Sequence, residues 1–570
     1  MKWIIFILLI VSVMLVGWYV WVEAERQGPE PATSGRSGNG AASLDAASVS
    51  NLVVAGDDHG AEDAAYRAGL ESQVDAVVNG TMAERQLPTA ALPLLQRRIM
   101  AGAPSAATTR PLGEALAKDG IRLANALAIQ KRLEWYRKNT LNIFERNCGR
   151  KTWAPAARAA IQAAVRLWDK DPRTTGDEDM IIWREARAAH KDGRDDPLLL
   201  FAWAQNVIQF NSPDSDRAWI YRASVAAALT MKEAGYPPAI QMAADLQAAR
   251  GIADNKPVSD RDRKEMNKLL DQSKALFGKV IADPELPRQA LLNLFDMMGE
   301  TSISVYGDRR TLPAPLFEQL KASRVDPSTV LTVQGYFNVD YAWDARGTGW
   351  GDTVTTEGSN LCEQRLAKAD AALEQAWKLD PSNSDAAAKM ISVELGQGEG
   401  RDRMELWFKR AMDADPDNYW ACLQKLYYLE PKWYGNGEEM LKFGRECLAG
   451  GNWDAGIPYV LVKAHLHLAQ YAGGQWTPAP QAEYFRNNPQ AWTEIRSVYA
   501  EDRRHRPRSE EKELQFARVA ASCGHWDEAN LMFQEVGNGY NSNVLSIPEM
   551  DRAKAETLMH YSPSTRPAGF

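Results

Sequence analysis

Apolar side chains recur at helical spacing along most of the chain. One run carries them at intervals of four, three, four and three residues, as Cys362, Leu366, Ala369, Leu373 and Ala376. This spacing places them on one face of a helix. The same period, interrupted by Pro, Gly and Asp-Pro breaks, predicts a long helix from Ile121 toward Phe144 and further helices over 156–168, 178–190, 197–210, 216–234, 238–250, 260–281 and 286–298. Strand-like alternation is almost absent, so the sequence predicts an all-α protein.

A short repeated sequence motif, called here the repeated phrase, marks where helices end. The phrase A-x-x-x-D-P-x-N occurs twice, 35 residues apart, as Ala376, Asp380, Pro381 and Asn383 and again as Ala411, Asp415, Pro416 and Asn418. The alanine lets a neighbouring helix approach, the residue before proline is disfavoured in the α region, and the asparagine side chain caps the next helix. Repetition at this interval is typical of stacked helix–turn–helix units. We therefore expect an α-solenoid.

One long apolar stretch lies at the N-terminus. Trp3 to Val22 spans twenty residues without a charge. A helix of that length rises about 30 Å, the thickness of the hydrocarbon core of a bilayer. Trp3 at one end, and Trp18, Tyr19 and Trp21 at the other, suit the two membrane interfaces. The sequence predicts a single transmembrane helix.

The charges that flank this stretch predict its orientation. Lys2 and the α-amino group precede it, whereas Glu23 and Glu25 follow it, with Arg26. Because the positive end stays in the cytoplasm, we expect a single-pass membrane protein with a cytoplasmic N-terminus and a periplasmic body. A cleaved signal peptide is the alternative, since residues 22–24 loosely resemble a cleavage site. The run is longer than a usual signal sequence and ends in bulky aromatics, which favours the uncleaved anchor and leaves cleavage open.

Composition narrows the class of protein. The chain has 570 residues, of which 45% are hydrophobic and 25% charged, as in ordinary soluble domains. A net charge of −8 argues against nucleic acid as a partner. The five cysteines are irregularly spaced and form no C-x-x-C, so neither a disulfide framework nor a zinc ribbon is expected. No cofactor or metal is predicted. The 19 tryptophans either wedge helices apart or line binding surfaces.

Two aromatic segments are the candidates for ligand binding. The first is a Gly- and Trp-rich stretch at 331–360, which interrupts the helical period, and the second is a loop beside Gly435 and Gly437. Their candidate residues are Trp343, Asp344, Arg346, Trp350, Trp433 and Tyr434. An arginine fork flanked by indole rings suits an anionic or sugar ligand. Alternatively, Asp344 and Arg346 pair with each other or with caps of neighbouring helices.

No catalytic residues are predicted. His465 and His467 form an H-x-H on a predicted helix, where two residues turn about 200° around the axis and the imidazoles diverge. A shared metal would need a spacing of four, so both histidines are interpreted as structural. Cys523 and His525 lie at a predicted turn without a visible third partner.

The repeated phrase resembles the tetratricopeptide repeat. That family places a small, a bulky and a second small residue on its second helix, then a proline, as in Ala369, Leu373, Ala376 and Pro381 and again, with Met404 for the first alanine, in Phe408, Ala411 and Pro416. The text from Gly524 to Ala529, followed by Phe533, resembles the turn and second helix of the same family. The resemblance implies an α-solenoid with a concave surface that binds proteins or peptides.

A larger block also resembles an uncharacterised bacterial family with a domain of unknown function. The block runs from YAWDARGTGW through LEPKWYGNGEEMLKFGREC. Members carry a W-D-x-R-G element, tetratricopeptide-like helices and a P-x-W element. This resemblance implies a bacterial envelope setting and supplies no activity.

Six segments follow from these patterns. They are an anchor with its flanks at 1–25, a Gly/Ser/Pro-rich linker at 26–60, an N-terminal helical region at 61–330, a connector at 331–360, repeats at 361–540 and a tail at 541–570. The expected function is a membrane-anchored, non-enzymatic scaffold for protein or peptide partners. The alternative is a glycan-binding or glycan-processing α/α protein with Trp-lined clefts, for which two converging carboxylates would be the mark. Oligomeric state and pathway stay open.

Overall fold

The computed structural model describes residues 110–170, 177–190, 196–209, 214–347, 349, 351–471, 478–506, 508–536 and 557. The predicted anchor, the linker, Trp350 and all of the tail but one residue lie outside these ranges. Within them, no helix is both long and apolar enough to cross a bilayer.

The described part of the chain is built from α-helices and one short 3-10 helix at Gly351–Thr353, without strands. The prediction of an all-α protein is therefore confirmed for this part. The helices up to the middle of the chain are α4 (Arg110–Asn139), α5 (Leu141–Cys148), α6 (Ala154–Asp169), α7 (Glu178–His190), α8 (Pro197–Gln209), α9 (Asp214–Met231), α10 (Pro238–Asp254), α11 (Asp260–Val280), α12 (Arg288–Tyr306) and α13 (Ala314–Lys321). The remaining helices are α14 (Pro327–Arg346), α15 (Thr356–Leu379), α16 (Ser384–Gln397), α17 (Arg401–Ala414), α18 (Tyr419–Tyr428), α19 (Gly437–Ala449), α20 (Tyr459–Tyr471), α21 (Pro478–Asn487), α22 (Pro489–His505), α23 (Glu510–Ser522) and α24 (Trp526–Val536).

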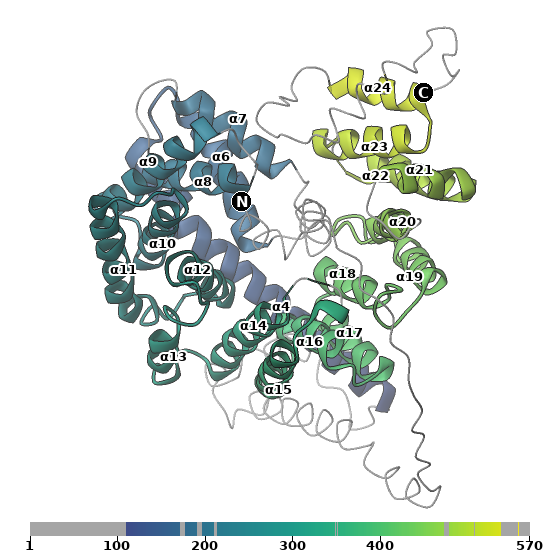
Figure 1. Ribbon diagram of the computed structural model, residues 1–570, viewed down its shortest axis with the longest axis horizontal. Coiled ribbons are helices and arrows are strands. Elements are labelled where there is room, and N and C mark those ends of the chain that lie inside the picture. Colours follow the sequence, from purple (N-terminus) through teal and green to yellow (C-terminus); the bar gives the residue numbers. More distant parts are fainter. Residues whose placement is uncertain are drawn as a thin grey trace, which may run out of the picture.

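Consecutive helices pack in pairs, and the pairs follow one another along an arc (Figure 1). From α10 to α22, each even-numbered helix contacts the next even-numbered one, so these helices form one row. The odd-numbered helices α11, α13, α15 and α19 lie on the outside of the arc (Figure 1). This two-row arrangement of helix pairs gives the body an inner face and an outer face.

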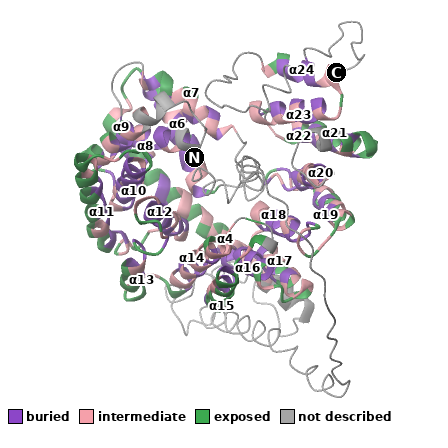
Figure 2. Ribbon diagram, viewed as in Figure 1, coloured by how far each residue is buried: buried purple, intermediate pink, exposed green. Residues whose placement is uncertain are grey.

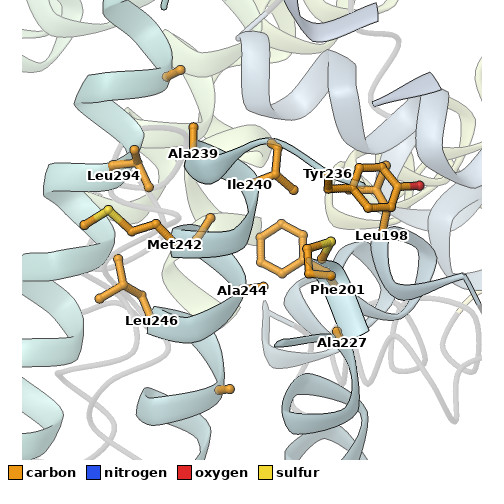
Figure 3. Close-up of a cluster of buried hydrophobic side chains, with 14 of the residues drawn as sticks. Leu198, Phe201, Ala227, Tyr236, Ala239, Ile240, Met242, Ala244, Leu246 and Leu294 are labelled. Atoms are coloured by element: carbon orange, nitrogen blue, oxygen red, sulfur yellow. The ribbon is translucent and has the colours of Figure 1, made fainter. Parts of the chain in front are cut away.

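The inner row is the more deeply buried. Figure 2 shows α11, α13 and α15 with many exposed residues, whereas α10, α12 and α16 are largely buried. Helix α10 illustrates the reason, because it has neighbours on both sides. Met242 and Leu246 point toward Leu294 of α12, while Ile240 faces Phe201 of α8 (Figure 3). A helix enclosed in this way needs apolar residues around most of its circumference.

Both copies of the repeated phrase act as the sequence predicts. The side-chain oxygen of Asn383 accepts the backbone N–H of Ala386 at 3.1 Å and begins α16, and Asn418 does the same at the start of α18. The alanines Ala376 and Ala411 are fully buried. Asn383 also donates to Thr332 of α14 at 2.8 Å, so this residue ties two neighbouring pairs together besides capping a helix.

The predicted connector at 331–360 is shorter in the structure. Helix α14 continues to Arg346, and only 347–355 separates it from α15. The prediction of an interrupted helix was wrong because α14 packs against α12, α15 and α16 at once and therefore shows no polar stripe. Gly335 permits the closest of these approaches, since a β-carbon there would lie 2.3 Å from Cγ of Leu373 on α15.

The helix expected from Ile121 toward Phe144 is divided at Thr140 into α4 and α5. Helix α4 bridges distant parts of the arc. Near its start, Lys118 forms an ion pair with Asp413 of α17. Near its end, the indole N–H of Trp135 donates to Asp283, just before α12, at 3.0 Å. Helix α4 thus connects α17 with the loop between α11 and α12.

Candidate functional site

The two aromatic segments singled out in the sequence meet in the structure. Trp343 and Arg346 lie in the last turn of α14, and Trp433 lies in the loop between α18 and α19. The two indole rings stand edge to face with centroids 6.0 Å apart. The Arg346 guanidinium lies 5.5 Å from the Trp343 centroid and 5.4 Å from the Trp433 centroid. Together with Tyr427 and Tyr434, these residues are named the outer Trp–Arg cluster.

Arg346 also holds the connector in place. Its guanidinium donates to the carbonyl oxygens of Gly347 at 3.4 Å and Gly349 at 3.2 Å. Gly347 has a φ of 77°, a conformation that other residues rarely adopt. The Arg346 side chain is only partly buried, so it combines a structural role with access to solvent.

The loop that carries Trp433 is fixed by a buried carboxylate. Glu430 is 1% exposed and accepts hydrogen bonds from the Nδ1 of His467 and from the hydroxyl of Tyr471 at 2.6 Å, and Lys432 lies 3.0 Å away. Burial by itself would raise the pKa of Glu430, but His467, Lys432 and Tyr471 together hold that pKa below its usual value. The loop is therefore anchored to α20 by a charged carboxylate.

Tyr434 is the most accessible ring of the cluster. Its side chain is 45% exposed, although its hydroxyl donates to the carbonyl oxygen of Leu395 at the end of α16 at 3.2 Å. The ring also packs on Tyr428, with centroids 4.8 Å apart. The outer cluster is thus a rigid aromatic surface that faces solvent at one edge, as stacking on a ligand requires.

Asp344 lies apart from this cluster. Its carboxylate pairs at 2.6 Å with Arg309, which also binds Glu300 of α12 at 2.7 Å. Burial raises the pKa of Asp344 and the charge of Arg309 opposes this rise. Asp344 therefore ties α14 to the loop after α12. Of the six candidate residues, Trp343, Arg346, Trp433 and Tyr434 come together, Asp344 does not, and Trp350 lies outside the described residues.

The two histidines diverge, as the sequence predicts. The His465 ring bonds to the Tyr484 hydroxyl and to Glu494, each at 2.9 Å, whereas His467 turns to Glu430. Burial lowers the pKa of His465, against the influence of Glu494. Among the residues that the structure describes, no group of three or more His, Cys, Asp or Glu side chains is arranged to hold a metal ion.

The inner row carries a second set of polar side chains, named here the inner polar row. Lys389 of α16 pairs with Asp340 of α14 at 2.8 Å and lies 4.7 Å from the centroid of the Tyr336 ring. The Tyr336 hydroxyl donates to the backbone carbonyl of Asp385 at 3.3 Å. One pair further along, Ser392 donates to Gln424 of α18 at 2.7 Å. Polar contacts therefore run from one inner helix to the next.

Asp296 of α12 also belongs to this row, although no sequence pattern points to it. No hydrogen bond or ion pair joins it to the rest of the described chain. Burial, with repulsion from Glu300 and Asp340, raises the pKa of Asp296 to about 7, against the influence of Arg309 and Lys170. Its surroundings thus disfavour the charged form of this carboxyl group, which has no hydrogen-bond or ion-pair partner among the described residues.

Sequence reasoning missed the loop anchors Glu430, Lys432 and Tyr471, and also Asp296. His467 and Tyr471 lie one turn apart on α20, whereas Glu430 and Lys432 lie in the loop after α18. No local spacing relates the loop residues to those of the helix. A signal was present only in the unusual density of polar residues on helices that are otherwise apolar, such as Lys389 and Gln424.

Comparison of the chain with models of protein families, with curated proteins and with solved structures finds no significant match.

Proposed function

We propose that the protein is a membrane-anchored, non-enzymatic interaction scaffold of the bacterial cell envelope, with a tetratricopeptide-like α-solenoid as its body. Residues 3–22 anchor it, and the inner face of the arc binds an extended segment of a protein or peptide partner. Stacked helix pairs commonly bind such segments, because consecutive inner helices present side chains at regular intervals.

The observation that carries this proposal is the inner polar row. Lys389, Asp340, Ser392 and Gln424 come from successive inner helices, and Asp296 adds a carboxyl group without a partner of its own. A row of alternating donors and acceptors suits the main chain and charged side chains of an extended peptide.

The test is co-purification of partners with the full chain extracted from membranes, followed by mass spectrometry. Asp296→Lys places a cation in the inner polar row. Asp271→Lys makes the same change on the outer helix α11, where the Asp271 side chain is 78% exposed. We expect specific partners to be lost at least tenfold with D296K and retained with D271K. The proposal fails if no protein co-purifies under several conditions, or if both variants behave alike.

A second candidate function is the binding of anionic glycans at the outer Trp–Arg cluster. The observation that favours it is the meeting of Trp343, Arg346 and Trp433 beside the exposed ring of Tyr434. Aromatic faces stack on sugar rings, and an arginine fork binds a carboxylate. Glu430, which anchors the loop of this cluster, and Asp344, which lies apart from it on α14, are both held in ion pairs. This supports binding and lends no support to glycan processing.

The second candidate is tested with an array of neutral and acidic oligosaccharides. If it holds, the full chain retains acidic oligosaccharides, and Trp433→Ala or Arg346→Ala lowers retention at least tenfold. Tyr306→Ala is the control, because it removes an aromatic ring from α12, away from the cluster. The Tyr306 side chain is 44% exposed, close to the 45% of Tyr434. Equal retention by all three variants would exclude the outer cluster as the site.

A further inference from the structure

The two ends of the arc touch. Asp177, which directly precedes α7, accepts a hydrogen bond from the hydroxyl of Ser509 at 2.9 Å and another from the backbone N–H of Glu511 at 2.8 Å. The second bond joins residues that lie 334 positions apart in the sequence. In Figure 1, α7 and α23 approach each other across the open side of the arc. These residues are named the clasp.

The clasp uses the free end of a helix. Ser509 caps α23 by accepting the N–H of Lys512, and Asp177 accepts the N–H of Glu511 in the same first turn. A carboxylate is favoured there, because the first N–H groups of a helix lack partners within it and the helix dipole is positive at that end. One residue from the N-terminal half thus completes the cap of a helix in the C-terminal half.

An apolar contact and an ion pair flank the cap. Met180 of α7 is 8% exposed and belongs to the hydrophobic cluster that otherwise consists of residues from α19 to α24, including Trp492 and Phe516. Arg184 of α7 lies 3.7 Å from Glu510. The clasp is small compared with the contacts between neighbouring helices, so it can separate without disturbing either half.

Like charges face each other across the clasp. Burial, with repulsion from Asp179, Asp177 and Glu178, raises the pKa of Glu511 to about 8, against the influence of Lys463. Burial also raises the pKa of Asp179 to about 6, although Asn206 donates to this carboxylate at 2.7 Å. Two acidic groups therefore bind protons more tightly while the clasp is closed.

Apart from Arg184 and Glu510, which meet across the clasp, the other charged groups around it have ion-pair partners or charged neighbours within their own half of the molecule. Glu178 pairs with Arg166 of α6 at 3.0 Å. Lys512 lies 3.5 Å from Asp502 of α22, and burial, together with Arg506, lowers the pKa of Lys512 to about 8. Lys463 of α20 has its pKa lowered by burial and by Arg518. Asp177 acts on Lys512 across the clasp and favours its charged form. Glu511 and Asp179 are the acidic groups whose pKa is raised in the closed state.

We propose that the contact between Asp177 and the start of α23 is a pH-dependent clasp that closes the arc when Glu511 and Asp179 are protonated and opens as they ionise. Opening would admit a long partner to the inner polar row, a consequence that rests on the proposed function. The clasp itself does not depend on it.

The direction of the response follows from proton binding. In the closed state the pKa of Glu511 is raised from its ordinary value of 4.5 to about 8, and opening shifts it toward the ordinary value. Between these two values the closed state binds more protons, so a rise in pH favours opening. For one such group, the ratio of closed to open molecules falls by as much as about tenfold for each pH unit.

The test is a distance measurement by pulsed electron resonance on the full chain. Spin labels are placed through Ala188→Cys on α7 and Ala500→Cys on α22, both at exposed positions. The background replaces the two partly exposed cysteines, Cys148 and Cys523, by serine, because the other three are buried. The distances are recorded from pH 6 to pH 9.

As the pH rises, we expect the mean distance between the two labels to lengthen, or the distribution of distances to broaden. Glu511→Gln removes the main titrating group and should flatten this response, whereas Glu483→Gln, at an exposed position on α21, should leave it unchanged. If circular dichroism shows that the Glu511→Gln chain does not fold, Asp179→Asn is the second variant. It should reduce the change in distance at the acidic end of the pH range. A distance that does not change with pH overturns the clasp, as does an equal response of the Glu511→Gln and Glu483→Gln chains.

Discussion

Two clusters in this molecule consist of an arginine between two tryptophans, and they differ in burial. The more deeply buried of the two is named the buried Trp–Arg cluster. In it, Arg410 of α17 lies 3.8 Å from the Trp377 centroid and 4.5 Å from the Trp407 centroid. The indole rings stand edge to face, 5.8 Å apart, much as Trp343 and Trp433 do. The exposures are 6%, 1% and 8% for Trp377, Trp407 and Arg410, whereas the rings and guanidinium of the outer cluster are only partly buried.

The difference follows from where each cluster lies in the helix pairs. Trp377 lies in the last turn of α15, as Trp343 does in α14, but Trp407 lies in the middle of α17, and neighbouring helices cover both rings. Trp343 lies at the end of α14 and Trp433 in a loop, where the cover stops. The indole N–H groups of Trp377, Trp407 and Trp433 all lack a hydrogen-bond partner among the described residues, so an unpaired donor does not distinguish the clusters. Exposure does, and it separates a stabilising cluster from one that is open to a ligand.

The largest effect is expected from Trp407→Ala. The change empties a site that is 1% exposed, and loss of a buried tryptophan costs about 3–5 kcal/mol of stability. Trp433→Ala should cost less than half as much, since the ring is partly exposed. Chemical unfolding of both variants measures the two values. Equal losses would remove the distinction between the clusters.

A smaller difference is expected between the two arginines. Arg410→Ala removes a buried cation from two ring faces and should cost about 2 kcal/mol, whereas Arg346→Ala should cost about 0.5–1 kcal/mol, because a cation–π contact is weaker where water reaches it. The free energies of unfolding of the two variants, compared with that of the unchanged chain, test the order. A larger loss for Arg346→Ala would reverse the assignment of roles.

The loop of the outer cluster should respond to acid. Because partners lower the pKa of Glu430 below its usual value of 4.5, its charged form stabilises the fold above pH 4.5. This contribution is lost as the pH falls through the lowered pKa of the folded state. Glu430→Gln should therefore cost about 1–2 kcal/mol at pH 7, and the difference should shrink below pH 4.5. Thermal unfolding from pH 3 to pH 7 measures this. Glu438→Gln, at an exposed position on α19, is the control and should show no such trend.

The smallest effect is expected from Tyr434→Phe. The change removes only the hydrogen bond to Leu395 at 3.2 Å on a side chain that is 45% exposed, so the loss should be at most about 1 kcal/mol. The aromatic face stays, and retention of acidic oligosaccharides should be unchanged if the outer cluster binds them. A loss of retention with an unchanged stability would transfer the binding role from the ring to the hydroxyl.

Local sequence patterns account for most of the helices and for several of their ends. The caps at Asn383 and Asn418 and the buried alanines Ala376 and Ala411 were readable, because capping, helix termination and the 3.6-residue period act between residues a few positions apart. The divergence of His465 and His467 was readable for the same reason. The continuation of α14 to Arg346 was not, since a helix that is covered on several sides shows no polar stripe.

Which polar and aromatic residues meet depends instead on how the helix pairs pack together. It brought Trp343 to Trp433, took Asp344 away to Arg309, and set Asp177 at the start of α23. Each of these contacts depends on the summed rotation from one helix pair to the next, to which every pair adds a small angle. No local pattern encodes that sum. Sequence patterns therefore indicate residues with suitable chemistry, whereas the stacking of the helices selects those that form the outer cluster, the inner polar row and the clasp.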